Sequence, residues 1–266
     1  MTCAGSSSNP AGPLLLAVNG ADERLQVALG RVSDQGAQLL AAQEWTVPGE
    51  AVRFLAPGVR DMLRGLGLTA ADVDRAACVR GPGSFTGLRM SLSFVEGFAA
   101  ATGALLAGLD HLPLLAREAA LTLPAGGALL TLVWARRGQV YAQAFAPGGA
   151  ALGEALVLPL AQTLAHLRSL PRPLYLLGGG LRRNRALFDE LAAADPDLHL
   201  LPPGFDAPRP AALLDAAAAA DFGPGPLAPA YLRASDAEDN LAAIAAGRGL
   251  TEAEARAILG RGSVPL

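Results

Sequence analysis

The stretch Arg80–Arg89, with the sequence Arg-Gly-Pro-Gly-Ser-Phe-Thr-Gly-Leu-Arg, constrains the fold more than any other part of the chain. It joins the apolar run Ala76–Val79, which is typical of a buried strand, to an apolar segment with helical spacing. The glycines and the proline between them predict a tight turn, and Ser84 is a competent helix N-cap. The stretch therefore predicts a strand, a glycine turn and the beginning of a helix.

Such a glycine turn suits an anion, because free backbone N–H groups and the helix dipole point the same way. It is also typical of a plain strand-to-helix connection, which the glycine spacing alone favours. A P-loop is excluded, because that motif ends in Gly-Lys-Ser/Thr and this chain contains no lysine. A second glycine run follows the predicted strand Leu174–Leu177 and leaves the same alternatives open. The candidate loop glycines are Gly81, Gly83, Gly87, Gly178, Gly179 and Gly180.

The stretch Gly81–Arg89 resembles the signature of the TsaB proteins, which are the dimerization subunit of the bacterial tRNA threonylcarbamoyladenosine machinery. That family is glycoprotease-like and belongs to the ASKHA superfamily. Further segments match that family in the same order, namely Leu14–Leu29, Ala135–Tyr141 and Pro229–Arg233. The resemblance implies a two-subdomain actin-like ATPase (ASKHA) fold. This is an α/β architecture in which each half is a mixed sheet flanked by helices.

Length and composition agree with a folded, soluble protein, since the chain has 266 residues with 52% hydrophobic content. With a net charge of −3, the chain lacks the overall positive field that is typical of autonomous nucleic-acid binders. We therefore expect contact with tRNA only through a complex. Cys3 and Cys78 form neither a disulfide framework nor a metal-ligand spacing, which fits a reducing compartment. The short apolar run after the polar first residues is neither a signal peptide nor a membrane span. We therefore expect a cytoplasmic protein.

The order of predicted elements divides the chain into four parts. We expect a disordered N-terminal extension (1–12), an N-terminal ASKHA subdomain that binds a partner (13–104), a C-terminal ASKHA subdomain (105–234) and a helical tail (235–266). The C-terminal subdomain includes an alanine-rich helix predicted for Asp215–Phe222. In the tail, a helix is predicted for 235–245, and Thr251 to Glu254 form a capping box that opens another. Both helices are expected to dock on the body or on a partner.

The resemblance also defines where nucleotide chemistry would lie. In actin-like ATPases, an acidic side chain in each of two equivalent hairpins organises Mg²⁺ and the nucleotide phosphates. This chain has Asn19 and Trp134 at those degenerate phosphate-loop positions. Because an amide or an indole offers Mg²⁺ little or nothing, we expect no ATP turnover, no catalytic residue and no metal site. We expect no cofactor, and weak binding of ATP or ADP is left open.

A protease is the second enzyme hypothesis, and the residues do not support it. His111, His166 and His199 are far apart without a His-Glu-x-x-His spacing, and we expect them at surfaces or caps. Ser84 lacks a Gly-x-Ser-x-Gly elbow. The arginines lie at Arg136 and Arg137 in a hairpin turn and at Arg182, Arg183 and Arg185 near a helix start. Because a helix N-terminus disfavours positive charge, the second cluster favours a nearby anion or acidic partner.

The resemblance implies a non-catalytic subunit that pairs with a TsaD-type threonylcarbamoyltransferase, which a TsaE-type ATPase joins. The family's pairing surface is built mainly from helices of the N-terminal domain, including the helix after the glycine turn. The predicted interface residues are Ser84, Phe85, Leu88, Ser91, Phe94, Val95, Gly97, Phe98 and Ala101. Two alternatives remain, an independent ATP-binding ASKHA enzyme (a kinase or carbamoyl-type transferase) and a homodimeric binding module.

Overall fold

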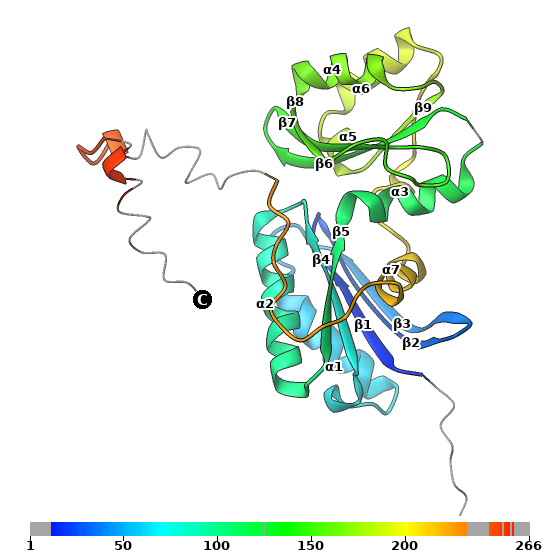
Figure 1. The fold of residues 1–266 in the computed structure, drawn as a ribbon, viewed down its shortest axis with the longest axis vertical. Coiled ribbons are helices and arrows are strands. Elements are labelled where there is room, and N and C mark those ends of the chain that lie inside the picture. Colours follow the sequence, from blue (N-terminus) through cyan, green and yellow to red (C-terminus); the bar gives the residue numbers. More distant parts are fainter. Residues whose placement is uncertain (1–11, 125, 233–244, 252, 256, 258–266) are drawn as a thin grey trace, which may run out of the picture. The chain divides into compact units, whose positions relative to one another are not determined.

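The structure is a computed structural model that describes residues 12–124, 126–232, 245–251, 253–255 and 257. The chain divides into two compact units, Met1–Ala230 and Tyr231–Leu266. The first unit contains two five-stranded sheets (Figure 1). Within the described residues, no helix is both long and apolar enough to cross a membrane.

The first sheet has the strand order β3-β2-β1-β4-β5. Its strands are β1 (Leu14–Asn19), β2 (Arg24–Ser33), β3 (Gly36–Thr46), β4 (Arg75–Gly81) and β5 (Leu105–Asp110). The first three strands are antiparallel neighbours, whereas β4 and β5 run parallel to β1. Every residue of β1 is buried, as expected for the central strand of a sheet covered on both faces.

Helices cover both faces of this sheet. On one face, α1 (Val52–Gly65) and α2 (Phe85–Thr102) pack on a core that includes Leu14, Leu16 and Val18. On the other, α7 (Pro210–Ala218) packs on Leu15 and Ala17. The alternation of β1 side chains between the two cores follows from the period of two in a strand. A 3-10 turn, η1 (Ala70–Asp72), follows α1.

The second sheet repeats the connectivity of the first, with the order β10-β9-β6-β7-β8. Its strands are β6 (Ala128–Arg136), β7 (Gln139–Phe145), β8 (Leu156–Pro159), β9 (Leu174–Leu177) and β10 (Leu198–Leu200). One face is covered by α4 (Leu160–Ser169), α5 (Gly179–Arg183) and α6 (Arg185–Ala194), and the other by α3 (His111–Thr122). A 3-10 turn, η2 (Pro203–Phe205), follows β10. The predicted two-subdomain α/β fold with a repeated plan is therefore confirmed.

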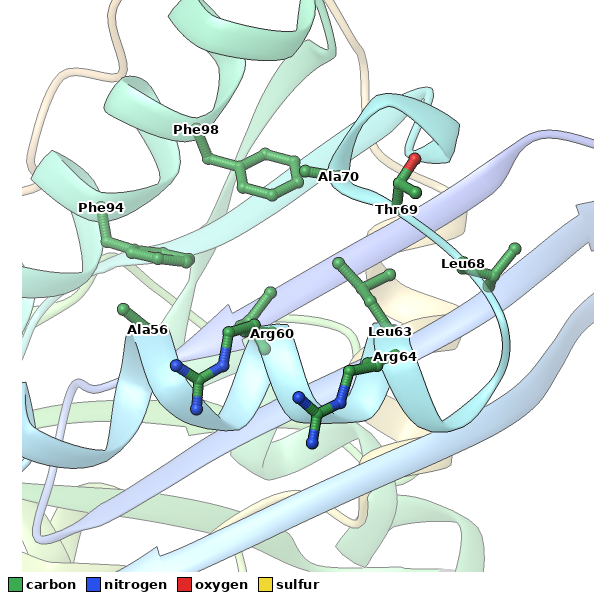
Figure 2. Close-up of a pocket in the computed structure, with 10 residues that line it drawn as sticks. Ala56, Arg60, Leu63, Arg64, Leu68, Thr69, Ala70, Phe94 and Phe98 are labelled. Atoms are coloured by element: carbon green, nitrogen blue, oxygen red, sulfur yellow. The ribbon is translucent and has the colours of Figure 1, made fainter.

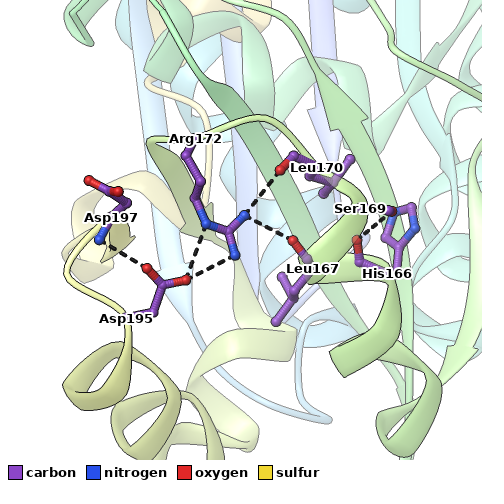
Figure 3. Close-up of polar contacts among 7 residues, drawn as sticks. All are labelled: His166, Leu167, Ser169, Leu170, Arg172, Asp195 and Asp197. Carbon is purple, nitrogen blue, oxygen red and sulfur yellow. Dashed lines mark hydrogen bonds and ion pairs between the residues drawn. The ribbon is translucent and has the colours of Figure 1, made fainter.

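Arg172 links the C-terminal ends of α4 and α6, two helices that pack on the second sheet (Figure 3). The Arg172 guanidinium donates to Asp195 Oδ2, at 2.9 Å from Nη2, and to the carbonyls of Leu167 and Leu170. Leu167 lies in the last turn of α4, and Asp195 is the C-cap of α6. Cations are favoured at helix C-termini, where unpaired carbonyls and the helix dipole concentrate negative charge.

The structure corrects two boundaries of the sequence analysis. The strand at Leu105–Asp110 pairs with β4, so it belongs to the first sheet although we assigned residues from 105 onward to the C-terminal subdomain. The alanine-rich helix is Pro210–Ala218 rather than Asp215–Phe222, because Pro210 occupies a favoured first helical position. That helix also packs on the first sheet, so the chain returns to its first half after completing the second.

The second unit contains the predicted capping box. Thr251 N–H donates to Glu254 Oε2 at 2.8 Å, and Glu254 N–H donates to Thr251 Oγ1 at 3.3 Å. Ala245, Leu250 and Ala255 form a small apolar cluster beside it. Residues 1–11 of the predicted extension and residues 235–244 of the other predicted tail helix lie outside the described residues.

Candidate functional site

The first glycine loop contacts the chain's own backbone. A Cβ atom at Gly83 would lie 2.2 Å from the carbonyl oxygen of Ala21, and one at Gly87 would lie 2.1 Å from that of Gly20. Gly81 has a φ of +133° and faces the carbonyl of Ala230. Because side chains would clash at each position, these glycines allow the β1–β2 turn to approach the start of α2 and residue 230 to approach the end of β4.

The loop also begins α2 as predicted. Ser84 is the N-cap, and its Oγ accepts a hydrogen bond from Gly87 N–H at 3.3 Å. The backbone N–H of Ser84 donates to the carbonyl of Ala21 at 2.7 Å. The hydroxyl therefore has the structural role expected of a capping serine, and the predicted cap is confirmed.

The structure separates the two faces of α2, which the sequence could not do. The predicted interface residues Leu88, Ser91 and Val95 are buried against the first sheet, so their assignment to an exposed surface is wrong. The remaining predicted residues reach the surface. Phe94 and Phe98 are half-buried, while the exposed members are Ser84, Phe85, Gly97 and Ala101.

An apolar groove lies between α1 and α2, which we call the α1–α2 groove (Figure 2). It has a volume of about 290 Å³ and is lined by Ala56, Val59, Arg60, Leu63, Arg64, Leu68, Thr69, Ala70, Phe94 and Phe98. The rings of Phe94 and Phe98 come from α2, with centroids 6.1 Å apart. In Figure 2 the guanidinium groups of Arg60 and Arg64 lie beside each other along α1. The groove is thus an apolar surface with a basic border.

The second glycine loop begins α5 and faces the first sheet's β1–β2 turn. Gly178 has a φ of +108°, and its N–H donates to Asp206 Oδ1 at 3.0 Å. A Cβ atom at Gly179 would lie 2.2 Å from Asp22 Oδ2. The space beside this loop is therefore taken by a carboxylate of the chain itself.

The two degenerate phosphate-loop positions are both engaged by other side chains. Asn19 is 2% exposed, donates from Nδ2 to Gln26 Oε1 at 2.8 Å and accepts at Oδ1 from Ala21 N–H at 3.1 Å. The guanidinium of Arg183 lies 5.5 Å from the centroid of the Trp134 ring. Neither position offers a carboxylate to a cation, and both polar atoms of the Asn19 side chain already have a hydrogen-bond partner within the chain.

Asp22 and Glu23, in the turn after Asn19, are site residues that the sequence analysis missed. Glu23 forms an ion pair with Arg183. The pKa of Asp22 is raised from its ordinary value of 3.8 to about 6, chiefly by burial. The charges of Glu23 and Asp206 also raise this pKa, whereas the hydrogen bond from Glu23 N–H and the charge of Arg183 lower it. The sequence signal for this contact was the cluster of Arg182, Arg183 and Arg185. The cluster predicted a nearby anion or acidic partner but did not show which residues would supply it.

That cluster has its predicted acidic partners inside the chain. Arg182 pairs with Asp206 at 2.6 Å, and Arg185 pairs with Asp189 at 2.7 Å within α6. Arg182 and Arg183 lie in the last turn of α5, where positive charge is favoured, rather than at the predicted helix start, and only Arg185 begins a helix. In the other cluster, Arg136 Nε donates to Gln139 Oε1 at 2.7 Å.

The histidines lie in three different elements. His111 begins α3 and is buried, with Nδ1 3.1 Å from the carbonyl of Pro82, so its expected place at a surface or cap is corrected. Burial lowers its pKa to about 4. His199 is exposed and stacks on Tyr175. Among the described residues, no group of three or more His, Cys, Asp or Glu side chains is arranged to hold a metal ion.

Sequence comparisons match parts of the chain to a family model and to a curated protein. Residues 47–173, which include α1, α2 and the first part of the second sheet, match the family model described as TsaD, tRNA N6-adenosine threonylcarbamoyltransferase. The chain is 30% identical over 127 residues to the tRNA threonylcarbamoyladenosine biosynthesis protein TsaB of Escherichia coli (strain K12). This match covers 48% of the chain and 52% of that relative, so the chain spans about half the length of the curated relative.

Solved structures extend the likeness over most of the chain. A Pseudomonas aeruginosa protein with similarity to peptidase YEAZ is 25% identical, with a TM-score of 0.61, and the match covers 83% of this chain and 100% of that one. YeaZ from Pseudomonas aeruginosa is 30% identical over 55% of this chain and 68% of its own, with a TM-score of 0.47. The repeated sheets and their helices define a two-subdomain α/β protein. Within that class, the chain is a TsaB-like protein.

Proposed function

We propose that this chain is a non-catalytic subunit that pairs with a TsaD-type threonylcarbamoyltransferase to form threonylcarbamoyladenosine next to the tRNA anticodon. The α1–α2 groove is the observation that carries the proposal. The names of the matched relative and family model support it, because both concern threonylcarbamoyladenosine in tRNA. A TsaE-type ATPase would join the pair, and tRNA would be contacted only through the complex.

The exposed side of α2 supports pairing with another helix. Ser93, Gly97 and Ala101 are small and exposed at four-residue spacing, so a second helix can approach closely there. Phe94 and Phe98 lie beside them and present apolar rings to the groove. Contiguous apolar surface of this kind is characteristic of protein–protein contacts.

The non-catalytic part of the proposal is supported by the two phosphate-loop positions. The Asn19 amide is buried and is already hydrogen-bonded to Gln26 and to Ala21 N–H. Trp134 lies under the guanidinium of Arg183, which is paired with Glu23. A nucleotide with Mg²⁺ would need oxygen ligands at residue 19 and free space at residue 134.

Size-exclusion chromatography with light scattering tests the pairing. The chain is measured alone and mixed with the TsaD-type protein of the same genome, and a one-to-one complex is expected in place of any homodimer. Gly97→Arg should abolish the mixed species while the monomer stays folded, because a Cβ atom at Gly97 meets no atom within 4 Å. Phe94→Asp should act in the same direction.

Gly153→Arg is the matched control, because Gly153 is also exposed with open space around it and lies in the second half of the chain. It should pair as the wild type does. If no mixed species forms at micromolar concentration, even with ATP and the TsaE-type protein, the proposal fails. Nucleotide hydrolysis over many turnovers by the chain alone would instead favour an independent ATP-binding enzyme.

A further inference from the structure

The lining of the α1–α2 groove indicates what kind of partner surface can fill it. Its floor is apolar, and Thr69, Arg60 and Arg64 supply the polar side chains of the lining. A site for a small polar ligand needs several convergent polar groups to orient that ligand. A groove between two helices with an apolar floor instead fits the apolar side chains of a third helix.

The border of the groove on α1 carries positive charge. Arg60 and Arg64 are exposed and four residues apart, so they lie on the same side of the helix. Arg60 Nε donates to Asp61 Oδ1 at 2.9 Å. Among the contacts of the described residues, the Arg64 side chain has no hydrogen bond or ion pair.

This charge differs from that of the whole chain. Asp61 is the only acid in α1, which also contains Arg53, Arg60 and Arg64, whereas the chain has a net charge of −3. Two like charges at a spacing of four residues repel each other and destabilise a helix. A carboxylate placed between the two guanidinium groups would reverse that effect.

We infer that the partner segment in the α1–α2 groove is an amphipathic helix whose apolar ridge is flanked by Asp or Glu side chains that pair with Arg60 and Arg64. The inference rests on the proposed function, because the helix would belong to the TsaD-type partner. The partner helix must therefore present both apolar and acidic side chains. The apolar ridge contacts Phe94 and Phe98, and the carboxylates set the orientation of the helix along α1.

The test is the affinity of the TsaD-type partner for an Arg60→Glu/Arg64→Glu variant, measured by isothermal titration calorimetry between low and high NaCl. Both side chains are exposed, so the variant should keep the wild-type circular dichroism spectrum. At low salt the affinity should fall by about 10- to 100-fold, and its dependence on salt should become flatter.

Arg53→Glu is the control, because it makes the same Arg-to-Glu change, at one position instead of two, on an exposed side chain of α1 that does not line the groove. It should change the affinity by less than about threefold. If the double variant binds with wild-type affinity and salt dependence, the inference is overturned while the proposed function stands.

Other occupants of the groove give different outcomes. A double variant that loses only a homodimer, while its mixed complex is unchanged, assigns the basic border to a second copy of this chain and overturns the inference. If the wild-type chain forms no mixed complex, both the proposed function and the inference fall.

Discussion

Asn19 stands at one of the two positions where the family resemblance implies an acid, and its neighbours are arranged for an amide. Gln26 is anchored by its own Nε2, which donates to the carbonyl of Pro208 at 2.6 Å and to Glu44 Oε1. Its Oε1 therefore faces residue 19 and needs a donor there. A carboxylate would place oxygen against oxygen in a buried site.

We therefore predict that Asn19→Asp lowers the free energy of unfolding by about 1–3 kcal/mol, the usual cost of leaving buried polar groups unpaired. Urea denaturation at pH 7 measures the change. Gln35→Glu is the control, since the exposed Gln35 side chain makes the same amide-to-acid change in a turn and should cost little. Equal stability of Asn19→Asp and wild type would show that the network tolerates an acid, and nucleotide binding should then be tested in that variant.

Asp22 gives a pH dependence of stability with a definite sign. Its pKa is raised to about 6 when the chain is folded, so between about pH 4 and 6 the folded state holds a proton that the unfolded state releases. The contribution of Asp22 to stability is therefore greatest at low pH and is lost as pH rises through about 6. His111, with its pKa lowered to about 4, has the opposite effect, because the unfolded state takes up its proton first as pH falls.

Asp22→Asn should remove the first effect alone. The variant is expected to be more stable than the wild type at pH 7, by on the order of 1 kcal/mol, with the difference shrinking toward pH 4. Thermal unfolding of both proteins from pH 4 to 8 measures this difference, and Asp34→Asn, at an exposed turn position, is the control. A difference that grows toward low pH would contradict the assignment.

At the scale of elements, the sequence predicted those parts of the fold that have a strong local pattern. Strand β1, the glycine turn and the cap at Ser84 each follow from residues close in the chain. Strands β8 and β10 were not predicted, because they have only four and three residues and are held by pairing with β7 and β9. Such pairing depends on residues distant in the sequence.

The candidate site could be predicted only in part for a related reason. Helix α2 is apolar on more than one face, so its periodicity did not show which face meets the sheet. The structure assigns Leu88, Ser91 and Val95 to the core and Phe94 and Phe98 to the α1–α2 groove. The groove itself needs α1 beside α2, and that contact is a consequence of the sheet order.

Arg172 gives a prediction for two elements at once, because its guanidinium bonds the last carbonyls of α4 and the Asp195 carboxylate at the end of α6 (Figure 3). Arg172→Ala should lower the free energy of unfolding by about 1–3 kcal/mol, since charge-assisted hydrogen bonds to partly buried groups are lost. Arg168→Ala removes an exposed arginine from the same helix end and should cost less than about 0.5 kcal/mol. Denaturant melts that show equal costs for the two variants would contradict this role.

At the scale of the whole first unit, the two sheets meet through contacts beside the second glycine loop. The β1–β2 turn of the first sheet presents Asp22 to Gly179 and Glu23 to Arg183. Arg183 also lies over Trp134 of the second sheet. The chain's own charged groups therefore contact each other beside Trp134, one of the two positions where the resemblance implies phosphates.

Breaking this contact should loosen the two halves without unfolding either one. The Glu23–Arg183 pair is about half exposed, with side-chain exposures of 45% and 50%, so a double-mutant cycle of Glu23→Gln and Arg183→Gln should give a coupling of only about 0.5–1 kcal/mol that declines with salt. Hydrogen exchange should nevertheless quicken in 20–23 and 178–183 together, because the ion pair joins both segments. Arg185→Gln breaks an equally exposed pair inside α6 and should leave the β1–β2 turn unchanged. Faster exchange at 178–183 alone would mean that the β1–β2 turn does not depend on this ion pair, and the two sheets would then be joined by other contacts, such as His111 with the carbonyl of Pro82.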